Sequence, residues 1–123
     1  DSVASRGLGD VYKRQNKTVT VIDDSIVRGT TAKKIIKMIR KAGAKKIHMR
    51  IASPPVTGPC YYGIDTPNRQ ELIAGTSSEK EIKEFITADS LKYISVEGLH
   101  KAVKGNGYCD ACFTNNYPIK KRA

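Results

Sequence analysis

Two adjacent carboxylates and a turn rich in donors stand close together near the start of the sequence. Asp23 and Asp24 follow a short β-branched segment, and Arg28 and Gly29 come soon after them. Ligands of parallel sheets bind at the carboxyl ends of the strands. Carboxylates placed there suit sugar hydroxyls or a magnesium ion, which prefers oxygen ligands.

The turn after the carboxylates has the features of a phosphate-binding loop. Gly29 lets the backbone approach a ligand closely, and Thr30 and Thr31 open a predicted helix whose first N–H groups carry partial positive charge. The turn and the carboxylates together predict a site for a phosphorylated sugar. The alternative is a ligand-free Asp-Asp-Ser turn that only caps the helix. The spacings of a nucleotide P-loop and of a dinucleotide-binding glycine motif are both absent from the sequence.

The three cysteines form a second candidate site. Cys109 and Cys112 make a C-x-x-C pair, and Cys60 lies far ahead of them. An odd number of cysteines is a poor disulfide framework, so metal binding or a redox pair in a reducing compartment is favoured. Three soft ligands suit zinc or an iron–sulfur cluster, and the spacing does not choose between them. Thiols that bind no metal are the alternative.

Alternating strands and helices are predicted to position these residues. β-branched or alternating patterns predict strands over residues 18–22, 46–52 and 91–96, the first of them buried. Helices are predicted over residues 30–42, 68–74 and 97–103, with another opening at a capping box over residues 76–79. Thr30 or Thr31 is expected to cap the first helix, and Phe85 is expected to face inward. This order indicates an α/β fold with a mostly parallel sheet.

The composition fits one globular domain of 123 residues, with 39% hydrophobic and 28% charged residues. The sequence contains neither a membrane-spanning apolar run nor a signal-peptide core, so we expect a cytoplasmic protein.

The net charge of +10 suits nucleic acid, a membrane surface or a phosphorylated small molecule as a binding partner. Most of the basic residues of the first helix are expected on its solvated face, and His48 and His100 at the surface.

The turn at residues 21–31 resembles the phosphoribosyl-pyrophosphate (PRPP) motif of type I phosphoribosyltransferases. The amino-acid sequence of this turn, DDSIVRGTT, is similar to that of the motif in the amidophosphoribosyltransferase family. The likeness covers roughly residues 16–118 in order, far more than one motif supplies by chance. It continues through residues 42–45, 53–55, 59–66, 71–74, 95–99 and 109–113. The resemblance implies a partial type I phosphoribosyltransferase fold, a mostly parallel sheet flanked by helices.

The resemblance also implies an activity. The family transfers the amide nitrogen of glutamine to the anomeric carbon of PRPP, giving 5-phosphoribosylamine, pyrophosphate and glutamate, the first step of de novo purine synthesis. The implied PRPP-binding residues are Asp23, Asp24, Ser25, Arg28, Gly29, Thr30 and Thr31, and the two aspartates also hold Mg²⁺. Purine nucleotides are implied as feedback inhibitors, and a homo-oligomer as the assembled state. Neither a specific nucleic acid nor a membrane is an expected partner.

One branch of this family holds a [4Fe-4S] cluster on four cysteines. Cys60, Cys109 and Cys112 match three of its ligand positions, and the fourth is expected before Asn16. The implied role of the cluster is structural, because it would pin the tail of the chain to the body of the domain.

Three parts of the chain are expected. Residues 1–15 show no similarity to the family sequence and are expected to be a non-native or disordered leader. Residues 16–104 are expected to form the carboxyl-terminal part of the phosphoribosyltransferase domain, and residues 105–123 a tail that carries the C-x-x-C ligands. The glutaminase half of the family, with its cysteine nucleophile, is expected upstream. The chain is therefore expected to contain no catalytic residue and to be inactive alone. The alternatives are another type I phosphoribosyltransferase or PRPP-sensing regulator, and a small basic zinc- or nucleic-acid-binding module.

Overall fold

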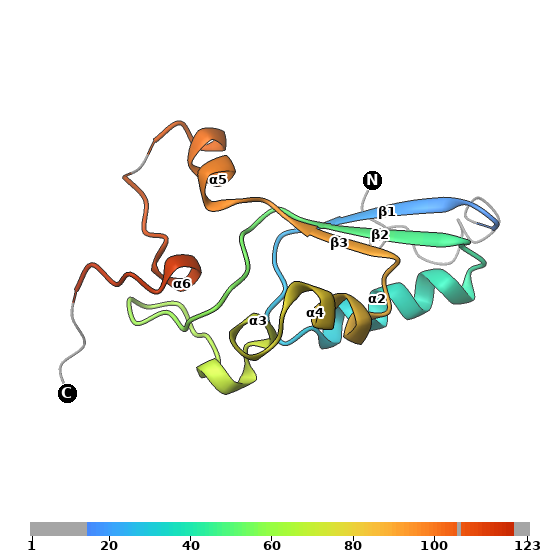
Figure 1. The fold of residues 1–123 in the computed structure, drawn as a ribbon, viewed down its shortest axis with the longest axis horizontal. Helices are drawn as coiled ribbons and strands as arrows, with labels where there is room; N and C mark the ends of the chain where they lie inside the picture. The colour runs from blue at the N-terminus through green and yellow to red at the C-terminus, as the bar shows by residue number, and fades with distance from the viewer. Residues whose placement is uncertain (1–14, 106, 120–123) are drawn as a thin grey trace.

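The computed structural model describes residues 15–105 and 107–119, which form a parallel sheet with helices packed on it (Figure 1). Its strands are β1 (Thr18–Asp23), β2 (Lys46–Ile51) and β3 (Ser90–Tyr93), in the spatial order β1-β2-β3. Both strand pairs are parallel, with Val21 opposite Met49 and Met49 opposite Leu91. The expected leader lies outside the described residues except for Gln15.

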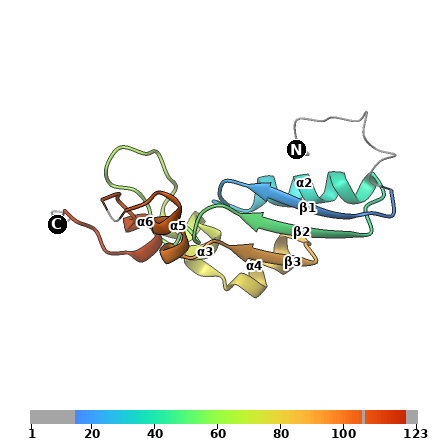
Figure 2. The same cartoon turned by 90° about the horizontal axis from the view of Figure 1, so that it is seen from above.

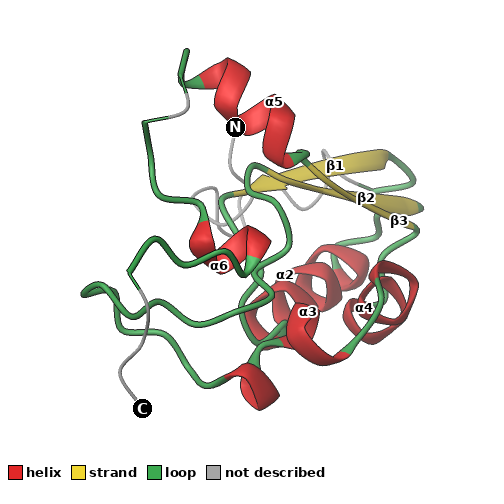
Figure 3. Ribbon diagram, turned by 60° about the vertical axis from the view of Figure 1, so that its left-hand side comes forward, coloured by secondary structure: helices red, strands yellow, loops and turns green. Residues whose placement is uncertain are grey.

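Helices make the two crossovers between the strands. α2 (Thr30–Lys41) connects β1 to β2, and η3 (Arg69–Glu71), α3 (Ile73–Thr76) and α4 (Glu79–Ile86) lie between β2 and β3. α2, α3 and α4 lie on the same side of the sheet (Figure 3). The core between sheet and helices is aliphatic, with Ile36, Ile39, Ile47, Met49, Ile82 and Ile86 each at most 1% exposed. The α/β fold with a parallel sheet is confirmed.

The opposite face of the sheet is polar and open to solvent. In β1 the side chains of Thr18 and Thr20 are exposed, and that of Ile22 is 71% exposed. On β2 and β3, Ser90 Oγ lies 2.6 Å from His48 Nδ1 and accepts a hydrogen bond from Arg50 at 2.9 Å. The expectation that β1 is a buried strand is therefore wrong for the described residues. Its β-branched residues follow strand propensity, and only those that face the helices are covered.

The helix ends differ from the predicted ones. α2 is preceded by Gly29, and neither threonine caps it with its side chain. The capping box of α4 is formed by Ser78 and Glu81, two residues later than predicted, because the same Ser/Thr-x-x-Glu spacing occurs twice here. None of the helices in the described residues is both long and apolar enough to span a membrane.

The remaining helices lie beyond the carboxyl end of the sheet (Figure 2). α5 (Val96–Ala102) is capped by Ser95, and α6 (Ala111–Thr114) follows after a turn. His100 Nε2 lies 3.0 Å from Asp110 Oδ2, so a half-buried hydrogen-bonding contact links α5 to the residue before α6. His100, expected at the surface, is thus only partly exposed.

Asp89→Ala is expected to destabilise the fold by about 1 kcal/mol. Asp89 Oδ2 accepts hydrogen bonds from the Ile47 N–H at 2.8 Å and from Arg40 at 3.1 Å, tying the start of β3 to β2 and α2. The bond from Ile47, with a smaller contribution from Arg40, holds the pKa of Asp89 below its usual value. A lowered folded-state pKa contributes stability above the unfolded pKa and loses it as the pH falls through the folded one.

Urea denaturation measures this effect. The difference between the wild type and Asp89→Ala should be largest near neutral pH and should shrink as the pH falls through the lowered folded-state pKa of Asp89. Glu84→Ala, which removes an exposed carboxylate from α4, is the matched control. A loss of stability in Asp89→Ala that stays constant with pH contradicts this account.

Candidate functional site

The predicted phosphate-binding turn forms a pocket at the carboxyl end of β1. The loop leaves the sheet there and enters the first turn of α2, and Figure 1 shows it on the side toward α5 and α6. The pocket has a volume of about 330 Å³ and is lined by residues 23–32, which include every residue assigned to the turn. The structure thus brings the carboxylates, the glycine and the two threonines to one pocket.

The two aspartates are held differently. Asp23 is half-buried, its carbonyl accepts the Ala52 N–H at 2.9 Å, and its Oδ1 accepts the Asp24 N–H at 2.8 Å. Asp24 is exposed, and the Ser25 hydroxyl lies at hydrogen-bonding distance, 3.4 Å, from its Oδ1. The bond from Ala52, directly after β2, holds the backbone that carries the first carboxylate, while the second carboxylate is exposed to a ligand.

Gly29 is the tightest point of the loop. Its φ is +83°, a conformation that side chains disfavour, and a Cβ there would lie 2.9 Å from Ile73 Cδ1 and 3.2 Å from Phe85. The loop is also tied to α3, because the Ile73 N–H donates to the Val27 carbonyl at 2.9 Å. The loop therefore passes close over the side chains of α3 and α4, and both the positive φ and this close packing favour glycine at position 29.

The start of α2 is well suited to an anion. Among the described residues no side chain caps it, and the first N–H groups of a helix have no partner within the helix. The residues that carry these N–H groups, Thr30, Thr31 and Ala32, line the pocket. Arg28 is exposed beside them, and Lys33 Nζ lies 4.6 Å from the centre of the Phe85 ring. Phe85, expected to face inward, is 38% exposed because it lies beneath Gly29 at the edge of the core.

The three cysteines lie on two segments that the fold joins. All are free thiols: Cys60 and Cys112 are half-buried, and Cys109 is exposed. Burial raises the pKa of Cys112, and the neighbouring sulfurs of Cys60 and Cys109 raise it further. Within residues 15–105 and 107–119, however, no three Cys, His, Asp or Glu side chains gather closely enough to hold a metal ion. Among the described residues, the three cysteines thus lie on adjoining segments but do not form a complete metal site.

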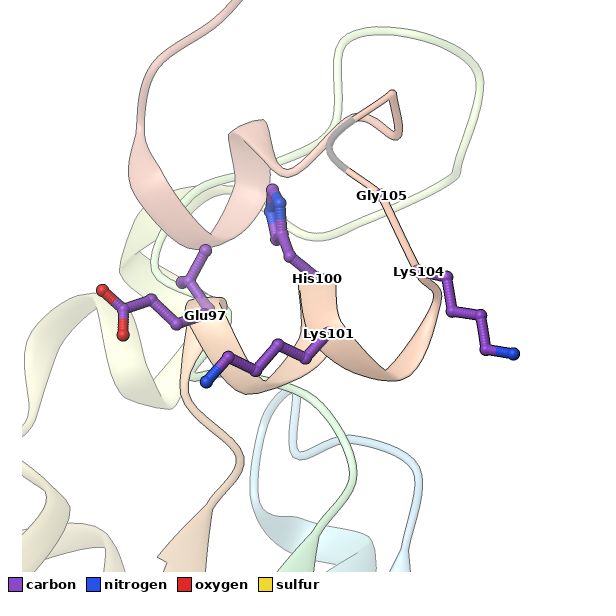
Figure 4. Close-up of a pocket in the computed structure, with 6 residues that line it drawn as sticks. Glu97, His100, Lys101, Lys104 and Gly105 are labelled. Atoms are coloured by element: carbon purple, nitrogen blue, oxygen red, sulfur yellow. The ribbon is translucent and has the colours of Figure 1, made fainter.

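A larger hollow of about 580 Å³ runs along α5 (Figure 4). It is lined by Val96, Glu97, His100, Lys101, Lys104 and Gly105. None of the predicted site residues contributes to it. The turn at residues 23–32 therefore remains the candidate site.

Comparison with known proteins decides the family. The chain is 53% identical over 108 residues to chloroplastic amidophosphoribosyltransferase 1 of Arabidopsis thaliana and 50% identical over 109 residues to the amidophosphoribosyltransferase of Archaeoglobus fulgidus. These matches cover 86% and 85% of the chain. The solved glutamine PRPP amidotransferase of B. subtilis, complexed with ADP and GMP, superposes on 98% of the chain with a TM-score of 0.82 and 44% identity. The chain belongs to the amidophosphoribosyltransferase family. No family model matches it.

The chain covers only part of the amidophosphoribosyltransferases that it matches. It spans 19% and 24% of the two curated relatives and 29% of the B. subtilis structure. The match supports the type I phosphoribosyltransferase fold, and it does not favour another phosphoribosyltransferase or a basic zinc- or nucleic-acid-binding module.

Some features of this amidophosphoribosyltransferase segment were not predicted from the sequence. Ile73 and Phe85 form the floor under Gly29, and Tyr117 and Asn115 join the tail to the loop before Cys60. These contacts connect residues far apart in the chain. Local patterns carry no signal for them.

Proposed function

We propose that the pocket at residues 23–32 binds PRPP, in a protein that transfers the amide nitrogen of glutamine to the anomeric carbon of PRPP. The observation that carries this proposal is the pocket itself, in which a half-buried and an exposed carboxylate face an uncapped helix start across a glycine with φ +83°. The amidophosphoribosyltransferase relatives supply the reaction. Its products are 5-phosphoribosylamine, pyrophosphate and glutamate, and it opens de novo purine synthesis.

The helix end of the pocket is the proposed place of the 5′-phosphate. The N–H groups and hydroxyls of Thr30 and Thr31 supply donors, Gly29 permits close approach, and the partial charge of the helix start favours an anion. Arg28 adds a full positive charge beside them. The phosphate is then held mainly by backbone atoms, whose positions are fixed by the packing of the loop on α3 and α4.

The carboxylates are the proposed contacts of the ribose hydroxyls and of Mg²⁺. Their oxygens fit this ion in kind, because Mg²⁺ is bound through one or two carboxylates plus substrate phosphates. When bound, Mg²⁺ neutralises charge on the pyrophosphate that leaves. Asp23 holds its position through β2, Asp24 reaches toward solvent, and Ser25 adds a hydroxyl. Displacement at an anomeric carbon depends on such positioning and charge stabilisation more than on a dedicated acid or base.

The cysteines are proposed to hold a [4Fe-4S] cluster. The donor set fits in kind, since three free thiols lie on segments joined by hydrogen bonds, and thiolates are the ligands of such clusters. Cys60, Cys109 and Cys112 would supply three ligands, and a cysteine from another part of the protein the fourth. A bound cluster supplies a covalent cross-link between loop and tail.

Regulation by purine nucleotides is a further part of the proposal. The B. subtilis relative was solved with ADP and GMP, and another solved relative, at 44% identity, is described as the allosteric regulatory enzyme of purine biosynthesis. Three further points stay predictions: assembly as a homo-oligomer, a cytoplasmic location, and the division of the chain into residues 16–104 and a tail at residues 105–123.

Arg28→Ala and Asp24→Asn in the full-length protein test the PRPP site. Each is expected to weaken PRPP binding about tenfold, because each removes one charged contact of the bound ligand. Loss of affinity in Asp24→Asn should depend on Mg²⁺ concentration, while that in Arg28→Ala should not. Calorimetric titration with PRPP at several Mg²⁺ concentrations measures both. Lys80→Ala, which removes an exposed cation on α4, is the charge-matched control, and wild-type affinity in both site variants would refute the proposal.

A further inference from the structure

The loop after β2 and the tail around α6 are joined by backbone hydrogen bonds. The N–H groups of Thr57 and Gly58 both donate to the carbonyl of Cys112, at 2.9 and 3.1 Å. Figure 1 shows this loop beside α6, well away from α2. The carbonyl that receives both bonds belongs to one of the three proposed metal ligands.

Side chains of the tail complete the junction. Asn115 donates from Nδ2 to Thr57 Oγ1 at 2.9 Å, and the Tyr117 hydroxyl donates to the Pro59 carbonyl at 2.7 Å. The Tyr117 ring also packs on that of Tyr61, with 4.9 Å between ring centroids. We call this set the loop–tail clamp, comprising Thr57, Gly58, Pro59, Cys112, Asn115 and Tyr117.

Gly58 shows how closely the clamp is fitted. It is buried, and a Cβ at this position would lie 2.5 Å from the Tyr117 hydroxyl and would also overlap Asn115 Oδ1. A Cβ on Gly107, by contrast, would meet nothing within 4 Å. The tail therefore closes directly on the backbone of the loop, and a Cβ at position 58 would displace the ends of the Asn115 and Tyr117 side chains.

The clamp holds two proposed ligands using protein atoms alone. Cys60 directly follows Pro59, whose carbonyl is bonded, and Cys112 accepts two bonds on its own carbonyl. We propose that the loop–tail clamp, with Tyr117 as a positioning residue, places Cys60 beside Cys112 before a metal binds. This inference rests on the proposed thiolate site. Metal binding then completes the docking of the tail rather than causing it. Cys109, exposed and outside the clamp, is the ligand of these three that is left to be recruited.

Preorganisation of this kind acts on metal affinity. A ligand set that is already in place does not have to be ordered when the metal binds, so less of the binding free energy is lost. Removing one hydroxyl from the clamp should then weaken metal binding, although Tyr117 contacts no metal.

Hydrogen exchange of the metal-free, full-length protein tests whether the clamp forms alone. After chelation, the amides of Thr57 and Gly58 are expected to exchange at least about tenfold more slowly than in an unstructured peptide. Tyr117→Phe should speed their exchange about fivefold, as loss of one hydrogen bond does. Tyr108→Phe, on a residue 66% exposed, should leave exchange unchanged. Gly58→Ala should remove the protection, and Gly107→Ala should not. Exchange at the unstructured rate in the metal-free wild type overturns the proposal.

Cadmium titration tests whether the clamp positions the ligands. Thiolate-to-cadmium absorption in the ultraviolet reports binding, and Tyr117→Phe is expected to weaken Cd²⁺ affinity about tenfold relative to Tyr108→Phe. Thermal unfolding of the two variants should coincide, which separates positioning from general stability. Equal Cd²⁺ affinity in both variants overturns the positioning role. Absence of thiolate–cadmium binding in the wild type instead refutes the proposed metal site, while the exchange data still report on the clamp.

Discussion

Gly29→Val in the full-length protein is expected to lower PRPP affinity by at least about a hundredfold, or about 3 kcal/mol. Two costs add. A side chain at φ +83° is disfavoured by about 1–2 kcal/mol, and more for a β-branched residue. The new Cβ would also lie 2.9 Å from Ile73 Cδ1 and 3.2 Å from the Phe85 ring, so these side chains must shift or the loop is displaced. Because the loop carries the donors of the phosphate site, its displacement removes them together. Calorimetric titration with PRPP measures the loss.

Gly105→Val is the matched control for this substitution. A Cβ on Gly105 would meet nothing within 4 Å, and its φ lies outside the left-handed region. Gly29→Ala, which adds the Cβ alone, should give an intermediate loss. Circular dichroism of each variant shows that the protein titrated is folded. Wild-type PRPP affinity in folded Gly29→Val would show that this loop does not hold the ligand.

The sheet and the long helix could be predicted because local patterns determine them. The β-branched run of β1 and the period-two alternation of β2 are both typical of strands, and the spacing of Ile36 and Ile39 in α2 follows the helical repeat. Periodicity does not tell which face of a sheet is covered. Ile22 and Val21 are both β-branched, yet only Val21 faces the helices. Val21 is therefore 5% exposed, whereas Ile22 is 71% exposed.

The residues of the candidate site could be predicted, but the packing that shapes it could not. Asp23, Asp24 and Gly29 are neighbours in the chain, so their spacing alone places them in one turn. The floor of that turn comes from Ile73 and Phe85, more than 40 residues away. The expected threonine cap of α2 shows the same difficulty. A cap depends on where the chain enters the helix, and here a glycine with positive φ makes the entry.

The cysteines show the opposite case, in which spacing identifies the residues and leaves their arrangement open. Cys109 and Cys112 are close in sequence and differ in exposure, because only Cys112 lies in the helix that docks on the loop. Cys60 reaches the same region through the hydrogen bonds of Thr57, Gly58 and Pro59. Such contacts are set by the tertiary fold.

Cys109→Ser is expected to reduce the iron and sulfide of the anaerobically reconstituted full-length protein to background. Serine offers a hard oxygen that is protonated at neutral pH in place of a soft thiolate, and a cluster that loses one of four thiolates loses most of its stabilisation. Cys109 is the most informative position because it is exposed, so the substitution leaves the core and the loop–tail clamp intact. Iron, zinc and sulfide analysis with visible absorption measures the cluster.

Asn116→Ser, at another exposed position of the tail, should retain full iron content. A wild type that binds only zinc, or full iron in Cys109→Ser, contradicts the cluster assignment. PRPP affinity of the folded variant, measured alongside, separates the two sites, because the cysteines lie outside the pocket at residues 23–32.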